Sequence, residues 1–321
     1  MFMVKRKITQ QQLGRIQKRL AVLQHDDQQE LFDGLVILRY AHSAIIETTD
    51  GRLLCCAIRP AITSLVVGDK VLWQPQGVDA GVVVSCYPRQ TLLSRWHAHK
   101  GEQAIAANVS QMLIVIASKP EISWILLDSY LIIADYLHIT PIIILNKTDL
   151  NCDSIKERLL KIYAPLSYKI LFTRYDENFT PEFLQTLLNQ VSVIVGPSGV
   201  GKSSLITRLL PAYAEKIKIG ALSELSELGC HTTFNAQYYH LPQGGAVIDS
   251  PGVRSMQLIK LPLIAIMQAY REFVPYLSKC RYRNCTHHST PGCAIIEAMR
   301  TQCISAERYE NYLKIIKLWC L

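Results

Sequence analysis

Two short motifs occur in an unusual order along this chain, and that order limits the possible folds more than any other feature. The run Asn146-Lys147-Thr148-Asp149 precedes the run from Gly196 to Ser203, which matches the phosphate-loop pattern G-x-x-x-x-G-K-[ST]. Where both motifs share a domain, N-K-x-D ordinarily lies downstream of the phosphate loop. The reversed order predicts a circularly permuted domain, which keeps one spatial site although the chain enters it elsewhere.

The phosphate-loop motif lies between a strand pattern and a helix pattern. The β-branched run 191–195 precedes it, and apolar residues at helical spacing follow from 204 to 210. The glycines would let backbone N–H groups converge on phosphate oxygens, Lys202 would reach the β- and γ-phosphates, and Ser203 would hold Mg²⁺. A chance glycine-rich turn is the alternative. The predicted phosphate-binding residues are Gly196, Pro197, Ser198, Gly199, Val200, Gly201, Lys202, Ser203 and Ser204.

The N-K-T-D motif follows the apolar run 141–145, which predicts a buried parallel strand. The motif then falls at the carboxyl end of that strand, where α/β sheets bind ligands. Asp149 would accept hydrogen bonds from N1–H and the exocyclic amine of guanine, a pair that adenine lacks. Asn146 would meet the opposite edge of the base and the Lys147 stem would cover its face, while Thr148 completes the motif. A polar turn after a strand is the alternative for these letters alone.

A third element predicts the remaining contacts to Mg²⁺ and the γ-phosphate. The apolar run 246–248 leads into D-x-P-G, in which Asp249 would hold the Mg²⁺ shell through water and the Gly252 N–H would face the γ-phosphate. Val253 follows, where many GTPases carry a glutamine that orients water. Because valine neither donates nor accepts hydrogen bonds, hydrolysis must use another group.

The switch I position is expected between the phosphate loop and D-x-P-G, at residues 229–234. Either Thr232 or Thr233 would be a ligand of Mg²⁺, and we assign Thr233 together with Ser203. His231 is the nearest candidate for orienting the attacking water, with Lys202, Thr232 and Thr233 as the other catalytic residues. The alternative for His231 is an ordinary surface histidine.

The C-terminal third carries a separate cluster of metal-binding residue types. Cys280, Cys285, His287 and Cys293 supply three thiols and one imidazole within fourteen residues, a set suited to tetrahedral Zn²⁺. A closed set of four ligands predicts one structural zinc ion. Unliganded reduced thiols are the alternative. The other cysteines are dispersed and do not form a disulfide framework; they are Cys55, Cys56, Cys86, Cys152, Cys230, Cys303 and Cys320.

The rest of the chain divides by pattern. Five short β-rich runs between about Leu35 and Ser94 are separated by turn signals, which predicts a small closed barrel of OB-fold size; an SH3-like barrel is the alternative. From Ile105 strand and helix patterns alternate, which predicts a doubly wound parallel sheet. We expect a basic N-terminal arm over 1–32, an OB-fold barrel over 33–98, a circularly permuted α/β P-loop domain over 99–262 and a small α-helical zinc-binding domain over 263–321.

Charge and hydropathy favour a cytoplasmic protein with a polyanionic partner. The formal net charge is +8, and six cations fall within the first twenty residues, which predicts a phosphate-binding arm or a solvated tail. The N-terminus lacks the apolar core of a secretory signal, and the most apolar region, 122–145, is interrupted by charged residues and proline. With reduced cysteines, these features predict a cytoplasmic chain without membrane association.

Together these residues resemble one known family, the circularly permuted, ribosome small-subunit-dependent GTPases (RsgA). Besides the permuted motifs, the segments that carry the resemblance are Ile62 to Asp69, Ala106 to Val109, Gly229 to Thr233, Asp249 to Arg254 and Pro291 to Ile295. The resemblance implies an OB-fold, a permuted GTPase and a zinc domain that grip the small ribosomal subunit, with a water-positioning role at His231. Thr173-Arg174 replaces a small Ser/Ala pair expected beside guanine, which predicts looser base binding.

The predicted function is a GTPase that binds the small ribosomal subunit and its rRNA, hydrolyses GTP when stimulated by the subunit, and acts in late subunit maturation. GTP with Mg²⁺, and GDP after hydrolysis, are the predicted ligands, and we expect a monomer. Two alternatives remain at this point. One is an RNA-binding scaffold with nucleotide as a structural ligand, which the valine at 253 leaves open, and the other is a P-loop kinase or ATPase.

Overall fold

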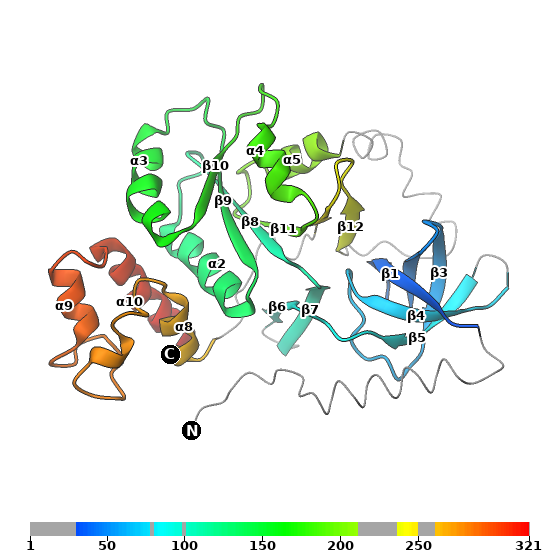
Figure 1. Cartoon of the computed structure of the whole chain (residues 1–321), viewed down its shortest axis with the longest axis horizontal. Coiled ribbons are helices and arrows are strands. Elements are labelled where there is room, and N and C mark those ends of the chain that lie inside the picture. The colour runs from blue at the N-terminus through cyan, green and yellow to red at the C-terminus, as the bar shows by residue number, and fades with distance from the viewer. Residues whose placement is uncertain (1–29, 78–79, 98–100, 211–235, 250–260, 321) are drawn as a thin grey trace.

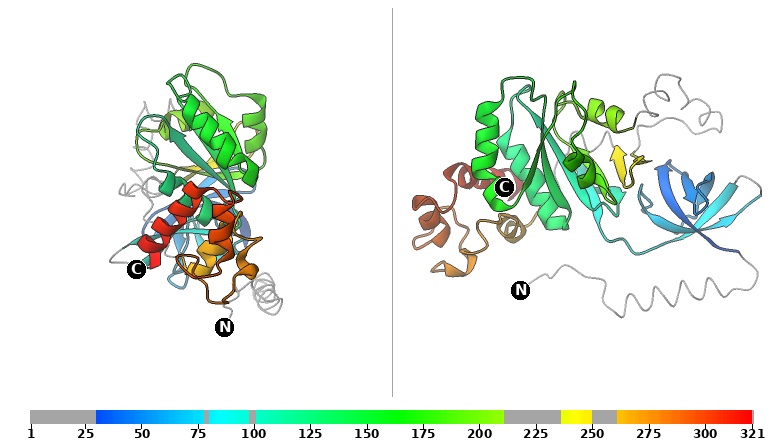
Figure 2. Two further views of the ribbon diagram at one scale, coloured as in Figure 1. Left: turned by 90° about the vertical axis from the view of Figure 1, so that its left-hand side faces the viewer. Right: turned by 45° about the horizontal axis from the view of Figure 1, so that its top comes forward.

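The computed structural model describes residues 30–77, 80–97, 101–210, 236–249 and 261–320. A β-barrel, an α/β domain and a C-terminal group of helices follow one another along the molecule. The α/β domain lies between the other two parts, as two of the views show (Figures 1 and 2).

The N-terminal part is a closed barrel of five strands, which confirms the predicted barrel. Its strands are β1 (Phe32–Arg39), β2 (Ser43–Thr48), β3 (Leu53–Ile58), β4 (Lys70–Pro75) and β5 (Ala80–Cys86). The pairs β1–β2, β2–β3 and β4–β5 are antiparallel, β3–β5 is parallel, and β1–β4 closes the barrel. Alternate residues point inward, so that Val36, Ile46, Trp73 and Val83 form its core.

A hairpin that the sequence did not reveal lies between the barrel and the larger sheet (Figure 1). It pairs β6 (Leu92–His97) with β7 (Gly101–Ala107). The barrel is joined to the end of this hairpin at Gly68, whose carbonyl accepts a 2.8 Å hydrogen bond from Nδ2 of Asn108. Buried Asp69 receives two bonds, of 2.6 and 2.7 Å, from the guanidinium of Arg89. These contacts fix the direction in which the chain leaves the barrel.

The α/β domain is built on a largely parallel sheet. Its strands are β8 (Gln111–Ala117), β9 (Thr140–Asn146), β10 (Lys169–Phe172), β11 (Val191–Val195), β12 (Gln237–His240) and β13 (Ala246–Asp249), and its helices are α2 (Trp124–Leu137), α3 (Asp153–Ile162), α4 (Pro181–Leu187) and α5 (Lys202–Leu209). The spatial order is β10-β9-β8-β11-β13-β12, and β12 alone of these strands runs antiparallel to its sheet neighbour. The pairing of Leu38 with Gln237 joins β12 to β1 of the barrel.

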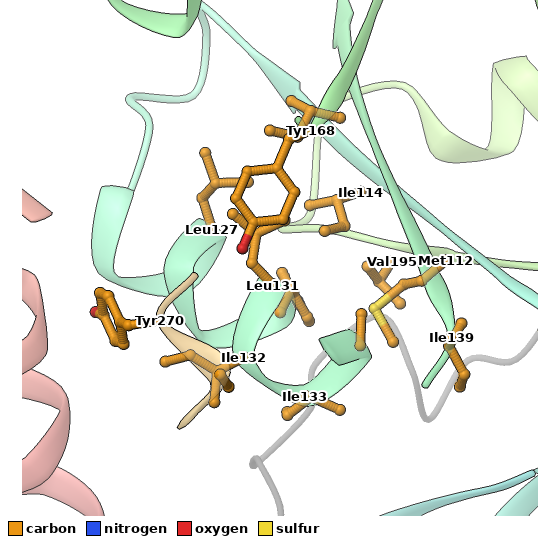
Figure 3. Close-up of a cluster of buried hydrophobic side chains, with 14 of the residues drawn as sticks. Met112, Ile114, Leu127, Leu131, Ile132, Ile133, Ile139, Tyr168, Val195 and Tyr270 are labelled. Atoms are coloured by element: carbon orange, nitrogen blue, oxygen red, sulfur yellow. The ribbon is translucent and has the colours of Figure 1, made fainter. Parts of the chain in front are cut away.

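The two faces of this sheet are covered by different helices. Met112 and Ile114 of β8 pack with α2, as Figure 3 shows, and α3 lies on the same face. Leu113 and Val115 point the other way, against α4 and α5. This doubly wound arrangement follows from the continuous apolar strands, because both faces of each parallel strand must be buried.

The C-terminal part consists of α8 (Leu263–Ala269), α9 (Ala294–Arg300) and α10 (Ala306–Cys320), with a short 3₁₀ turn at Leu277–Lys279. A second 3₁₀ turn, at Ala164–Leu166, belongs to the α/β domain. A buried polar cluster attaches it to α2: Arg308 contacts Asp128 and also Glu272, at 2.7 Å. Burial alone would lower the pKa of Arg308, but these two carboxylates raise it well above its ordinary value. Among the helices of the described ranges, none has both the length and the apolar composition needed to span a membrane.

Candidate nucleotide site and metal site

The N-K-T-D motif and the phosphate loop, distant in the sequence, meet at one edge of the sheet. Nδ2 of Asn146 donates to the carbonyl oxygen of Val200 at 2.9 Å. Nζ of Lys147 donates to the carbonyl oxygens of Gly199, at 2.6 Å, and Lys119, at 3.3 Å. The strands explain the meeting, because β8 separates β9 from β11 and all three run in parallel. Both loops therefore leave the sheet at its carboxyl edge.

The phosphate loop has the backbone that its glycines permit. Gly196, Gly199 and Gly201 all have positive φ, and a Cβ on Gly196 would lie 2.2 Å from the carbonyl oxygen of Val115. Lys202 is 6% exposed, and its Nζ donates to the carbonyl oxygens of Gly196, at 2.8 Å, and Pro197, at 2.5 Å. Its charge is thus held inside the loop, where phosphate oxygens bind in such sites.

An open cavity of about 330 Å³ lies over these residues. Its lining is Lys147, Ser198, Gly199, Gly201, Lys202, Ser203 and Ser204, so it draws on both motifs. The exposed hydroxyls of Ser203 and Ser204 stand at the beginning of α5, where backbone N–H groups are unpaired within the helix. This combination of N–H groups, hydroxyls and two lysines suits a polyphosphate.

The base side of the site contains Thr173, which the sequence analysis placed beside guanine but whose support of Asn146 it did not predict. Oγ1 of Thr173 donates to Oδ1 of Asn146 at 2.9 Å, and the Thr173 carbonyl accepts from the N–H and the hydroxyl of Thr148. Thr173 is buried and directly follows β10, which neighbours β9. That register is the signal that a strand-pairing argument could have used. Asp149 is exposed beside these residues.

Asp249 ends β13, and the pairing of Val193 with Ile248 places it beside the end of β11, which leads into the phosphate loop. The sequence prediction that it belongs to the same site is consistent with this register. The predicted switch residues His231, Thr232 and Thr233, and Gly252 of the D-x-P-G motif, lie outside the described residues.

A second candidate site lies in the C-terminal part, where one ligand atom from each of Cys280, Cys285, His287 and Cys293 lies within 4.8 Å of the others. Nδ1 of His287 is 3.5 Å from Sγ of Cys280 and 3.4 Å from Sγ of Cys293. Tetrahedral Zn²⁺ with ligands at about 2.0–2.3 Å needs separations of about 3.5–3.8 Å. The two distances from His287 are close to that range, and Sγ of Cys280 and Sγ of Cys293 lie 4.0 Å apart, so the set could hold a metal ion of that size. Burial lowers the pKa of His287, which favours the neutral imidazole that binds metals.

Helix α10 supports the loop that carries these ligands. Tyr309 donates to the carbonyl oxygen of His287 at 2.8 Å, and Tyr312 donates to that of Thr286 at 2.7 Å. Both tyrosines are buried, as is Arg308 of the same helix. The metal-binding loop is therefore connected through one helix to α2 of the α/β domain.

These features define a circularly permuted P-loop GTPase preceded by a β-barrel and followed by a Cys/His cluster that could hold a metal ion. The model of the RsgA GTPase family matches residues 86–259. The chain belongs to this family.

Relatives and solved structures agree with that assignment. The small ribosomal subunit biogenesis GTPase RsgA of Haemophilus influenzae (strain PittEE) is 41% identical, over 98% of this chain and 96% of the relative. The protein of the same name from Pectobacterium carotovorum is 38% identical, over 97% and 92%. The crystal structure of YjeQ from Thermotoga maritima matches with a TM-score of 0.74 at 26% identity, over 91% of this chain and 99% of that one. YloQ, a circularly permuted GTPase, shares the fold with a TM-score of 0.70 at 21% identity, over 91% and 96%.

Proposed function

We propose that this chain binds the small ribosomal subunit, hydrolyses GTP in a reaction that the subunit stimulates, and acts in late maturation of the subunit. The observation that carries the proposal is the 2.9 Å contact between Asn146 and Val200, because it brings a guanine-reading motif and a phosphate loop to one cavity. The ribosomal part rests on the relatives' name, small ribosomal subunit biogenesis GTPase.

The nucleotide would lie across the two motifs. On the base side, Asp149 reads the two donors of guanine, Asn146 meets its opposite edge, and Lys147 covers its face. On the phosphate side, Lys202 and backbone N–H groups of the loop hold the β- and γ-phosphates. Mg²⁺, held by Ser203, Thr233 and, through water, Asp249, would neutralise charge on those phosphates.

Hydrolysis also requires a group that orients water. We assign this role to His231, because Val253 cannot form the necessary hydrogen bond, and we assign Thr232 and Thr233 to the ordering of switch I around GTP. Docking on the subunit would complete this arrangement, so hydrolysis by the isolated protein should be slow. Release would follow hydrolysis as the switch loses its contacts to the γ-phosphate.

The metal ion that we propose for the Cys/His cluster is a structural Zn²⁺. Its four ligands leave no open position for chemistry, and their spacing fits the ion. Lys279, Arg281 and Arg283 interleave with the ligands, and Tyr282 is 44% exposed, which suits a surface for rRNA.

We further propose the four-part division at residues 32, 98 and 262, a basic arm that contacts rRNA, an OB-fold barrel that does the same, and a cytoplasmic monomer. The basis is the net charge of +8 together with the barrel topology. Like the assignments of His231 and Thr233, the arm, the domain boundaries and the cytoplasmic monomer rest on the sequence.

The test compares multiple-turnover release of phosphate from GTP with and without purified small subunits. A rate that rises by an order of magnitude or more on adding subunits supports the proposal. Equal rates would refute the coupling. Tight ATP binding without base preference would favour a P-loop ATPase or kinase, and nucleotide binding without turnover in either condition would favour an RNA-binding scaffold.

A further inference from the structure

Arg208 lies in the last turn of α5, the helix that begins at the phosphate loop, and its guanidinium contacts the loop that follows β10. One terminal nitrogen donates to the carbonyl oxygen of Arg174 at 2.9 Å, and the other donates to that of Glu177. The guanidinium carbon also lies 4.2 Å from the ring centre of Phe179. A single side chain thus holds three positions of residues 173–180, which we call the base-side loop.

The base-side loop begins at the residue that holds Asn146. Thr173 bonds to Asn146 through its hydroxyl and to Thr148 through its carbonyl. Asp149 is near enough to Arg174 to contribute to the raised pKa of that guanidinium, although the hydrogen bond with Asp176 is the larger cause. A displacement of this loop would therefore move the groups on which the base-reading motif depends.

Between Thr173 and Phe179, the side chains of the loop otherwise make local contacts or are exposed. Arg174 folds back on Asp176 with bonds of 2.8 and 2.7 Å, and Tyr175 is 73% exposed. At the far end, Phe179 stacks on Phe183 of α4 with ring centres 4.5 Å apart. Arg208 spans the middle, where its planar fork satisfies two carbonyl oxygens at once and its face packs on an aromatic ring.

We propose that Arg208 is a positioning residue for guanine: it couples the base-side loop to the phosphate-loop helix and so sets how strongly the site prefers guanine over related bases. This inference rests on the proposed nucleotide site. Helix α5 would then act at both ends, with its first turn at the phosphates, through Lys202 and Ser203, and its last turn at the base, through Arg208. Arg208 itself touches neither.

The experiment measures dissociation constants of the full chain for GDP and for inosine diphosphate by competition against a fluorescent GDP analogue. Inosine lacks the exocyclic amine that Asp149 reads, so the dissociation constant for inosine diphosphate divided by that for GDP reports the base site and cancels effects at the phosphates. We expect Arg208→Ala to weaken GDP binding roughly tenfold or more and to lower this ratio. Arg208→Lys should recover only part of the ratio, because an ammonium group lacks the planar fork.

Arg158→Ala is the matched control. Arg158 is also a half-buried arginine of the α/β domain whose guanidinium carbon lies over an aromatic ring, 3.9 Å from the ring centre of Trp124, but on α3. Its ratio should equal that of the unmodified protein. If Arg208→Ala weakened the binding of both nucleotides by the same factor, the ratio would stay at its original value and the inference would be overturned.

Two further results separate this inference from other failures. If the unmodified protein bound GDP no better than ADP, the proposed nucleotide site would fail, and Arg208 would not be the cause. If Arg208→Ala gave no cooperative thermal transition, Phe179→Leu would replace it, since leucine keeps an apolar side chain there but removes the flat face under the guanidinium. A lowered ratio in Phe179→Leu supports the inference, and an unchanged ratio overturns it.

Discussion

Nδ2 of Asn146 donates a hydrogen bond to the carbonyl oxygen of Val200, 2.9 Å away, although 54 residues separate them along the chain. The nearby Gly201 allows this approach, because a Cβ at that position would lie 2.3 Å from the same nitrogen. The base-reading motif and the phosphate loop therefore support each other directly. A change in either one is expected to affect the binding of both halves of a nucleotide.

Asp149→Asn should weaken GDP binding by about 10²–10⁴-fold, because the amide cannot accept both donors of guanine and leaves one group unpaired. Binding of xanthosine diphosphate should improve, since the amide N–H can donate to the carbonyl that xanthine carries at that position. Isothermal titration calorimetry measures both. Asp153→Asn, which changes an exposed aspartate at the start of α3, is the control. Unchanged GDP affinity in Asp149→Asn would contradict a guanine site.

Thr173→Val should lower the free energy of unfolding by about 1–3 kcal/mol, because the buried Oδ1 of Asn146 loses its donor. The affinity for GDP should fall as well, since Asn146 is then less firmly held. Thermal unfolding and the same titration measure the two effects. Thr301→Val, which alters an exposed hydroxyl that donates to the Glu297 carbonyl at the end of α9, should change neither quantity appreciably. Loss of stability without loss of affinity would show that Thr173 has only a structural role.

The fold was predictable where its signals are local. Strand, glycine-rich loop and helix follow one another from Val191 to Leu209, and each is indicated by residues within a few positions. The order of the motifs then predicted the permuted α/β domain, and the turn signals predicted the barrel. The comparisons and the topology confirm both.

Features that depend on distant partners were not predictable. The hairpin β6–β7 and strand β12 are partly polar, and β12 joins the barrel by pairing Gln237 with Leu38, far away in the sequence. Asp128 looked like an interruption of an apolar run, yet it is the buried partner of Arg308, 180 residues further on. Thr173 and Arg208 likewise gain their roles only from neighbours that folding supplies.

Gly68→Ala should destabilise the protein more than an ordinary glycine substitution. Gly68 has φ +85°, and an added Cβ would lie 2.3 Å from the backbone oxygen of Ala107, which the joint between the barrel and the hairpin holds in place. Gly51→Ala is a matched control, because Gly51 has φ +83° but open space around it. We expect a cost of about 1 kcal/mol for Gly51→Ala and about 3 kcal/mol or more for Gly68→Ala in urea unfolding. Equal costs would mean that the backbone around Gly68 and Ala107 moves apart to accept the added methyl group.

Arg308→Met should cost about 3–5 kcal/mol near neutral pH, because it leaves the buried carboxylates of Asp128 and Glu272 without the cation that both contact. Burial raises the pKa of Asp128, and attraction by Arg308 is the largest effect opposing that rise. Without Arg308 the folded state should bind protons more readily than the unfolded state. The loss of stability should therefore shrink as the pH falls from about 7 to about 4.

The comparison for that variant is Arg300→Met, which removes an exposed arginine of α9 whose ion pair with Glu297 is 3.8 Å long. Its cost should lie within about 0.5 kcal/mol of zero at every pH. Urea unfolding at several pH values gives both curves. A loss in Arg308→Met that did not depend on pH would indicate that the side chain acts through packing alone.

Cys293→Ser should abolish metal binding and loosen the C-terminal part. The unmodified protein is expected to carry about one zinc ion per chain, as measured by mass spectrometry of the metal, and a strong chelator should lower its melting temperature. Cys293→Ser should carry far less zinc and should melt at the lower temperature whether or not chelator is present. Cys303→Ser is the control, because Cys303 is an exposed thiol outside the cluster. If Cys293→Ser kept both its zinc and its melting temperature, the cluster would not be a zinc site, and the ribosomal surface proposed around it would lose its structural basis.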